Sequence, residues 1–221
     1  MNDNPVDAVT DEVAPRGGLI AALQVIAADA PAEGMTLHDF THALGERAFG
    51  LMLFALAIPV CIPLLYGIPQ IVSLPMMAIA MQMAIGRSEP WMPRRLGERM
   101  LGKAGLEQMA AGAGKYFGWI ERLARPRLLL LSGPTAERLV GAVFVVFIAS
   151  VLIPLPATNT LPGIGVAVAS IGLITRDGLL MLAGLAIGAA WILLLAVGVA
   201  VFGPAFVDLL KESIKALLGM S

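Results

Sequence analysis

A run of 24 residues without a charged side chain, Leu179 to Phe202, constrains this chain more than any other feature. An α-helix rises 1.5 Å per residue, so about 20 apolar residues cross a bilayer core about 30 Å thick. The run therefore predicts one full transmembrane helix at 179–202. Gly184 and Gly188 form a GxxxG pair inside it, which permits close helix contact within one chain or in a homodimer.

Composition agrees with a membrane setting. The 221-residue chain is 58% hydrophobic and 14% charged, whereas soluble domains have roughly 45–50% apolar and about 25% charged residues. Alternating ten-residue segments, the signature of outer-membrane strands, are not seen. The net charge of −1 gives no general case for binding nucleic acid. These features predict an all-α integral membrane protein, with the single cysteine, Cys61, as a small buried apolar residue.

A second feature is a pattern that occurs twice, at a constant offset of 91 residues. An acid–base pair opens each copy, a glycine follows three residues after the base, and a proline ends the first apolar run. We interpret the pattern as a duplicated, proline-broken helical hairpin, with repeat 1 at about 36–87 and repeat 2 at about 135–176. The aligned residues are Glu46, Arg47, Gly50 and Pro63 in repeat 1 and Glu137, Arg138, Gly141 and Pro154 in repeat 2.

The arms of these hairpins are short. Ala48–Pro63 and Gln70–Ile85 have 16 residues each, which would cover about 24 Å of a core about 30 Å thick. The joining segment, 63–69, has few polar groups for a water-exposed loop. Two short spans and a re-entrant hairpin, whose tip stays inside the membrane, are both compatible with this pattern, and we favour the re-entrant form. Parallel and inverted repeats are both left open.

Charged side chains stand where the arms meet the membrane surface. Ionisable groups at membrane depth are costly unless paired or hydrated, and arginine suits phosphate and carboxylate ligands. The charged side chains at these positions predict either a ligand or ion pathway, or a structural role only. In the structural alternative, each acid–base pair lies at headgroup level, or the four charges link the two repeats. The polar tip of the second hairpin could present further groups to a ligand, or satisfy its own turn. The candidate pathway residues are Glu46, Arg47, Arg87, Glu137, Arg138, Thr158, Asn159, Thr160 and Arg176.

The remaining segments complete one membrane domain, 19–221, after a disordered acidic tail at 1–18. Nine of the chain's 15 Lys and Arg lie between residues 86 and 133, so the positive-inside rule places this stretch in the cytoplasm. We expect the basic connector, 88–133, to form short amphipathic helices on the inner leaflet, binding anionic lipids or simply setting orientation. Thr36 and Thr135 are expected helix N-caps, and 204–219 is a last amphipathic helix.

Evidence for catalysis is weak. His38, His42 and Glu46 would share one helix face and suit a metal, but the chain has no other histidine. No nucleophile elbow, phosphate-binding loop or metal cluster is visible. We expect no enzyme activity, cofactor or metal, with a transferase using His42 and Glu46 as the weakest reading.

The sequence contains, in this order, Gly45 to Gly50, the proline-interrupted apolar pair, Gly86-Arg87 with Pro90 to Pro93, Ile153-Pro154, Thr158-Asn159 and Leu161-Pro162. Together, in this order and spacing, these features resemble the ExoD family of bacterial membrane proteins over about residues 18–205. The resemblance implies a multi-pass inner-membrane protein connected with exopolysaccharide synthesis, without a defined reaction or catalytic residues.

Two functional hypotheses follow. The first is a transporter or channel-like protein that moves a small anionic solute, an ion or a lipid-linked intermediate through a charged cavity between the repeats. The second is a non-catalytic scaffold or regulator of a polysaccharide-synthesis complex, for which the basic connector would matter most. Membrane lipids, a second copy of the chain and polysaccharide-synthesis proteins are the expected partners.

Overall fold

The structure is a computed structural model that describes residues 18–63, 67–123, 133–152 and 159–203, with the single positions 205, 208 and 212. Residues 1–17 of the expected tail and most of the expected helix at 204–219 lie outside the described residues. The elements are α1 (Leu19–Asp29), β1 (Met35–Thr36), α2 (Leu37–Leu44), α3 (Arg47–Cys61), α4 (Ile68–Ala84), α5 (Arg94–Gly97), β2 (Met100–Leu101), α6 (Lys103–Leu123), α7 (Pro134–Leu152), α8 (Thr160–Thr175) and α9 (Gly178–Phe202).

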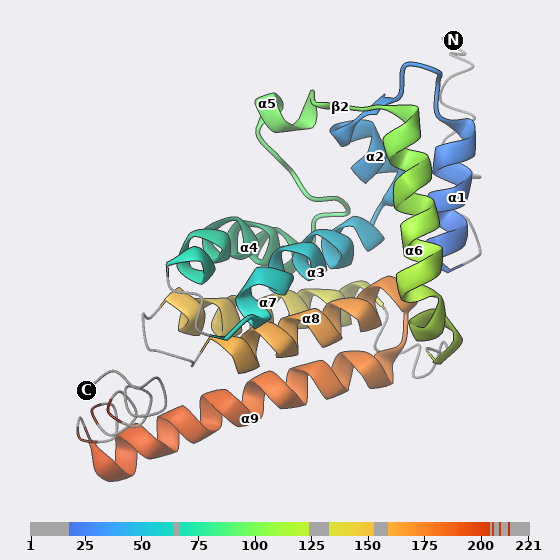
Figure 1. Ribbon diagram of the computed structural model, residues 1–221. Coiled ribbons are helices and arrows are strands. Elements are labelled where there is room, and N and C mark those ends of the chain that lie inside the picture. Colours follow the sequence, from blue (N-terminus) through green and yellow to red (C-terminus); the bar gives the residue numbers. More distant parts are fainter. Residues whose placement is uncertain are drawn as a thin grey trace, which may run out of the picture.

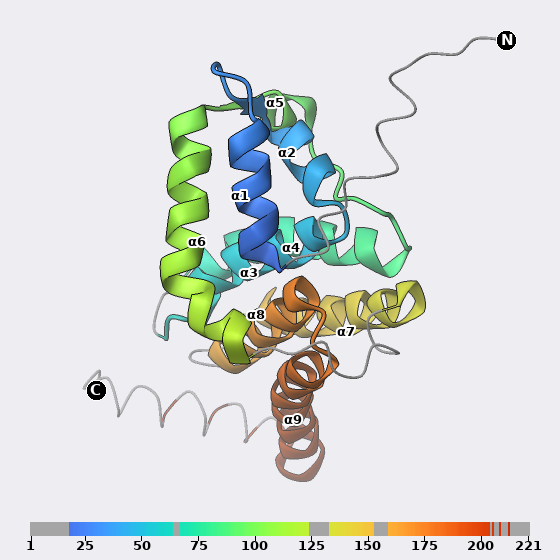
Figure 2. The ribbon, with the colours of Figure 1, turned by 90° about the vertical axis from the view of Figure 1, so that its right-hand side faces the viewer.

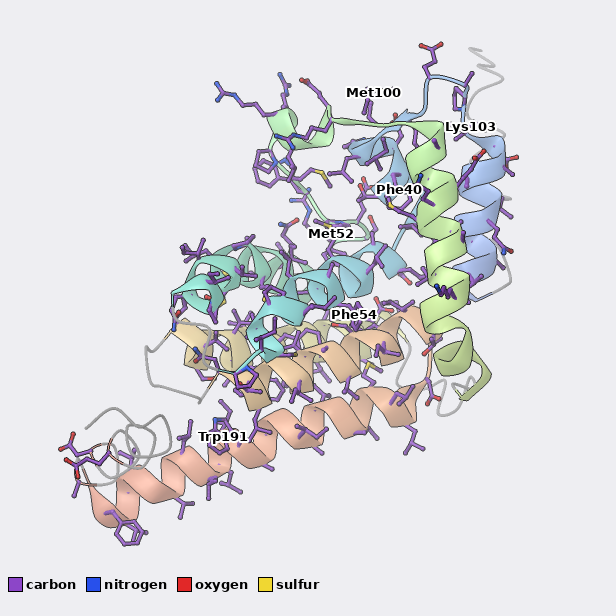
Figure 3. All side chains as sticks on the ribbon, viewed as in Figure 1. Phe40, Met52, Phe54, Met100, Lys103 and Trp191 are labelled. Carbon is purple, nitrogen blue, oxygen red and sulfur yellow. The ribbon has the colours of Figure 1, made fainter. Side chains whose placement is uncertain are left out.

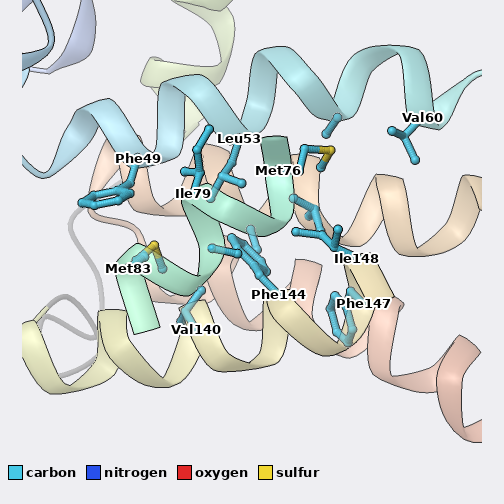
Figure 4. Close-up of a cluster of buried hydrophobic side chains, with 14 of the residues drawn as sticks. Phe49, Leu53, Val60, Met76, Ile79, Met83, Val140, Phe144, Phe147 and Ile148 are labelled. Atoms are coloured by element: carbon cyan, nitrogen blue, oxygen red, sulfur yellow. The ribbon is translucent and has the colours of Figure 1, made fainter. Parts of the chain in front are cut away.

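Most of the described residues are helical, which confirms the all-α prediction. Four apolar helices form a bundle in which each helix of one hairpin packs against a helix of the other (Figure 1). Helix α3 lies against α8, and α4 lies against α7. Their inward faces make one dry core (Figure 4), whose side chains are 3% exposed or less at Leu53, Val60, Met76, Phe144, Phe147 and Ile148.

Glycines bring the two hairpins into backbone contact. A Cβ atom at Gly50 of α3 would lie 2.9 Å from Cγ1 of Ile174 in α8. A Cβ atom at Gly141 of α7 would lie 2.6 Å from the backbone nitrogen of Ala84 in α4. Neither site has room for a side chain, so a glycine is required where the backbones meet.

Helix α9 confirms the helix expected at 179–202, and by length and composition it can cross a membrane. Asp177 begins it as the N-cap, with its carboxylate accepting hydrogen bonds from the amides of Leu179 and Leu180. Gly184 lies against Gly165 of α8, where an added Cβ would be 2.6 Å from the carbonyl oxygen, and Gly188 lies against the ring of Phe147. The GxxxG pair is therefore used inside the chain and gives no support to the expected homodimer.

A second group of helices crosses one end of the bundle. Helices α1 and α6 stand upright in Figure 1, while the bundle helices and α9 run across it, and Figure 2 shows α1 and α6 in front of the bundle. Leu23 and Ile26 of α1 bury their side chains with Leu106 of α6. At their far end, which Figure 3 places at the top, the Lys103 ammonium donates a hydrogen bond of 3.1 Å to the carbonyl of Ala30.

At three local features the structure can be compared with the sequence: the connector, the start of α2 and the start of α7. The connector is not a series of short helices, because after the single turn α5 it forms the 21-residue helix α6, whose apolar face α1 covers. Thr36 is confirmed as the N-cap of α2, accepting from the amide of Asp39 at 3.1 Å. Thr135 is not a cap, because α7 already begins at Pro134.

Exposed apolar surface covers the bundle and α9. Ile71 on α4, Ile85 directly after α4 and Leu193 on α9 are each more than 60% exposed, and large exposed apolar surface is unfavourable in water. By length and composition, two described helices, α7 and α9, can cross a membrane. The pair α2 and α3, bent by 117°, would make a third if it is one span.

Candidate functional site

Four helix ends meet at one end of the bundle. Helices α3 and α7 begin there, and α4 and α8 end there, because the hairpins pack with α3 on α8 and α4 on α7. In Figure 4, Phe49, Met83 and Val140 lie together near this end of the core, and Val60 lies at the other. We call this the charged end, defined by Glu46, Arg47, Arg87, Glu137, Arg138 and Arg176.

An ion pair joins the two hairpins at the charged end. A guanidinium nitrogen of Arg176, after α8, lies 3.9 Å from a carboxylate oxygen of Glu46, before α3. Both side chains are about half exposed, at 54% and 44%. Glu137, in the first turn of α7, is half-buried and within electrostatic range of both. Two carboxylates therefore share the field of one guanidinium, at a surface that water reaches.

Arg176 has an unusual backbone. Its φ of 54° and ψ of 35° place it in the left-handed region, and it is the one non-glycine residue with positive φ among those described. It occupies the position after the helix end where glycine is most common. The amides of Arg176 and Asp177 then bond the carbonyls of Leu173 and Gly172, at 3.4 and 2.9 Å. An arginine is therefore held where the backbone favours glycine.

Helix α4 ends in the same way, but with the expected glycine. Gly86 has a φ of 81°, and the amides of Gly86 and Arg87 bond the carbonyls of Met83 and Gln82, at 3.0 and 3.1 Å. The guanidinium of Arg138 from the other hairpin lies directly over Gly86, where a Cβ atom would overlap it. The absence of a side chain thus seats Arg138 at the C-terminal end of α4, where a cation is electrostatically favoured. Arg87, the next residue, is exposed.

Arg47 is placed differently from its counterpart Arg138. Its guanidinium reaches the carbonyl oxygen of Gly18, 3.5 Å away, at the start of α1. The side chain is half-buried, so Arg47 ties the crossing helices to the bundle. The two acid–base pairs are alike in sequence but unlike in their contacts.

The polar tip of the second hairpin is not part of this arrangement. Asn159 and Thr160 begin α8, whereas Arg176 follows its other end. Sixteen helical residues separate the two ends by about 24 Å. Thr158 lies outside the described residues. The expected pathway residues therefore fall into two groups at opposite ends of the bundle.

The space between the groups is filled. Leu53, Phe144 and Ile148 are at most 1% exposed, and they pack together between the four helices (Figure 4). Among the described residues, the bundle interior is an apolar core apart from the buried serines Ser73 and Ser170, and the charged end is its polar surface.

The metal site considered from the sequence required His38, His42 and Glu46 to share the face of one continuous helix, and this expectation is wrong. Helix α2 ends at Leu44, and Gly45, with a φ of 56°, turns the chain by 117° into α3. Glu46 therefore leaves the helix face that carries His38 and His42. Within the described ranges, no three His, Cys, Asp or Glu side chains are grouped to hold a metal ion.

One charged residue at this end was missed. Asp177 is 2% exposed and caps α9 directly after Arg176. An Asp before a glycine and a long apolar run is a recognisable N-cap signal. The result is an α-helical protein of membrane-associated type, with two helices able to cross a bilayer and a charged end formed by four helix termini.

Comparison with known proteins identifies the family. The chain matches the family described as "Exopolysaccharide synthesis, ExoD" over residues 19–197, and it belongs to this family. It is 29% identical over 155 residues to Protein ExoD of Rhizobium meliloti, covering 68% of this chain and 64%, less than two thirds, of that protein. It is 27% identical over 181 residues to an uncharacterized protein of Synechocystis sp., covering 79% and 84%. No solved structure matches.

The resemblance to the ExoD family that the sequence indicated is therefore confirmed. The family is membrane-associated and associated with exopolysaccharide synthesis.

Proposed function

We propose that this chain is a multi-pass protein of the bacterial inner membrane whose charged end is the mouth of a transport path. The cargo is a small anionic solute, an ion or a lipid-linked intermediate of exopolysaccharide synthesis. Four of the six groups that define the charged end are arginines, and guanidinium forks bind phosphate and carboxylate with two parallel hydrogen bonds.

The backbone of Arg176 is the observation that carries this proposal. A side chain in the left-handed region costs roughly 1–2 kcal/mol relative to glycine. The similar ending of α4 has Gly86, so glycine can serve at such a helix end. Strained residues of this kind gather at functional sites, where the side chain is needed. Arg176 uses its side chain to face Glu46 of the other hairpin.

The proposal includes an internal duplication. It is supported by the crossed packing of the hairpins, in which Gly50 meets α8 and Gly141 meets α4. It also includes re-entrant hairpins. Helices α3, α4 and α8 have 15, 17 and 16 residues and would cover about 22–26 Å, and α7, although long enough to cross by itself, is joined to the shorter α8 in the second hairpin. Their outer tips then end short of the far surface of a core about 30 Å thick.

Transport through this bundle requires the hairpins to separate. The core at Leu53 and Phe144 is closed, so the described arrangement is a closed state of the proposed transporter. The glycine contacts mark the surface along which the hairpins would part, and the ion pair from Arg176 to Glu46 bridges it. Opening would then couple to ligand binding at the charged end.

Uptake into proteoliposomes tests the transport proposal. Inorganic phosphate and glucuronate serve as compact phosphate and carboxylate probes. We expect uptake above protein-free vesicles, with Arg138→Gln and Arg176→Gln reducing it at least about tenfold, the effect of losing one charged hydrogen-bonded contact. Lys115→Gln on α6, which removes one positive charge elsewhere, should leave uptake unchanged. Uptake that is equal in all three variants would contradict a role for the charged end.

A scaffold or regulator is the second candidate. The observation that favours it is the filled core between the hairpins, since a scaffold needs no path through the bundle. In that case, exopolysaccharide yield would survive Arg176→Gln but fall when the exposed basic residues of α5 are replaced. Measuring the yield of both variants in cells separates the two candidates.

A further inference from the structure

The segment between α4 and β2 presents an aromatic side chain at a fixed position. The side-chain amide of Gln82, in the last turn of α4, donates a hydrogen bond to the carbonyl of Trp91 at 3.2 Å. Its oxygen accepts one from the Trp91 amide at 2.5 Å. These two bonds hold the backbone of Trp91 beside the end of α4, while its side chain is 60% exposed.

The residues that follow Trp91 are also held in place, by packing and by strand pairing. Met92 is buried, and it lies under Gly97 of α5, where an added Cβ would be 3.4 Å from Met92 Cγ and 3.5 Å from His38 Cβ. The chain then joins the pairing of Thr36 with Met100. Since both ends of the segment are held, what it exposes is determined by the fold.

The exposed groups of this segment are of two kinds. Trp91, Leu96 and Met100 are large apolar side chains that are 41–60% exposed. The charged side chains between residues 91 and 100 are three arginines and Glu98. Three positive charges minus one give this stretch a net charge of +2. The exposed basic residues are Arg94, Arg95 and Arg99.

The position of the segment indicates what it meets. Met81 and Ile85, on either side of Gln82 in sequence, are 54% and 72% exposed. Trp91 therefore lies where the exposed apolar surface of α4 gives way to the charged end. Aromatic rings settle at such boundaries between hydrocarbon and headgroups, and clustered arginines beside them attract anionic lipids.

We propose that residues 91–100, the basic–aromatic segment, bind the anionic headgroups of the membrane surface at the charged end. Trp91, Leu96 and Met100 enter the interface, and the three arginines contact lipid phosphates. This proposal is independent of transport, because it concerns the outer face of α4 and α5 and not the hairpin contact. Each arginine is expected to contribute about fivefold to the preference for anionic over zwitterionic lipid.

Fluorescence of Trp91 in nanodiscs tests this proposal on the full-length chain. Trp119→Phe and Trp191→Phe leave Trp91 as the sole tryptophan. The discs hold phosphatidylcholine with a minor fraction of phosphatidylglycerol, and bromine quencher is placed on one lipid or the other. Brominated phosphatidylglycerol should quench Trp91 several times more than its mole fraction predicts. The same bromine on phosphatidylcholine should quench it less than its mole fraction predicts.

Charge variants complete the test. Replacing Arg94, Arg95 and Arg99 with glutamine should bring both quenching values to the mole-fraction level, with unchanged helical circular dichroism. Replacing Lys115, Lys211 and Lys215 with glutamine removes the same charge elsewhere and should leave the preference intact. Quenching at the mole-fraction level in the unmodified segment, or a preference that survives the arginine changes, overturns the proposal. Trp91 that no lipid quenches points to a protein partner and overturns it equally.

Discussion

Gly86, which has no side chain, leaves the space in which the Arg138 guanidinium lies. Gly86 supplies both the left-handed turn that ends α4 and the space in which the Arg138 guanidinium lies. Arginine there faces the carbonyl end of a helix, where positive charge is favoured by about 0.3–1 kcal/mol. The acid–base pair of the second hairpin is thereby linked to the first.

A double-mutant cycle measures this contact. Gly86→Ala should lower the free energy of unfolding by about 2–3 kcal/mol, because it adds backbone strain of about 1–2 kcal/mol and displaces the guanidinium. In an Arg138→Ala background the same change should cost only the strain. Unfolding in mild detergent provides the four values. If the two changes are additive, the guanidinium does not depend on Gly86.

At the scale of helices, small residues decide which surfaces meet. Gly50 and Gly141 allow the two hairpins to approach, and Gly184 allows α9 to lie on α8. Without a hydrophobic driving force between helices in lipid, such close contacts provide much of the attraction. The bundle is therefore sensitive to one added methyl group at these positions, whereas glycines with open space around them, such as Gly112, tolerate it.

Paired glycine substitutions test this difference. Gly141→Ala should destabilise the bundle by about 1–3 kcal/mol, since its Cβ would meet the backbone of α4 and the helices must shift. Gly112→Ala on α6 has open space around it and should stabilise by about 0.5–1 kcal/mol, through helix propensity alone. Thermal unfolding in detergent compares the two. A stabilising Gly141→Ala would mean that α7 and α4 do not touch as described.

Much of the helical structure could be predicted from the sequence, for physical reasons. Uncharged runs of helical length predicted α3, α4, α7, α8 and α9, and a capping threonine predicted the start of α2. The pairing of α6 with α1 could not be read, because basic amphipathic residues suit a membrane surface and a protein surface alike. The partner of the GxxxG pair was equally undetermined, since close packing within and between chains uses the same residues.

For the candidate site, sequence reasoning went part of the way. The matched acid–base pairs implied that charges would gather if the hairpins entered the membrane together, and the structure does bring Glu46, Glu137 and Arg176 to one end. The sequence could not reveal the left-handed backbone of Arg176 or the position of the Arg138 guanidinium over Gly86, because both depend on how α8 and α4 end. It also grouped Asn159 with the charged end, although a helix length separates them.

At the scale of the whole molecule, the charged end lies at one end of the bundle, and α8 begins at Thr160 at the other end. Our proposal places the charged end in the cytoplasm, because Lys and Arg are concentrated after α4 and the positive-inside rule assigns such stretches to that side. In the proposed orientation the exposed apolar side chains of α4 and α9 would contact lipid. In this orientation α9 would run from the cytoplasmic surface outward, and the start of α8 would lie toward the outer surface.

Cysteine labelling tests this orientation and the proposed re-entrant hairpins. In a Cys61→Ser background, Ala205→Cys, just after α9, should react with an impermeant maleimide added outside the cell, because 25 residues carry α9 across. Asn159→Cys at the second tip should stay unlabelled, because about 24 Å of helix does not reach the outer surface. Labelling at position 159 as fast as at 205 would show that the hairpins cross, and labelling at neither would reverse the orientation.

The exopolysaccharide yield of an Arg176→Gly strain tests the central claim, that Arg176 is kept at the charged end for function at a cost in stability. Glycine relieves the left-handed strain, so the variant should insert normally and unfold with about 1–2 kcal/mol more free energy. Its yield should nevertheless fall to that of the deletion strain, while Arg176→Lys, which keeps the charge, retains part of it. A stabilised Arg176→Gly protein that restores the full yield would contradict the account.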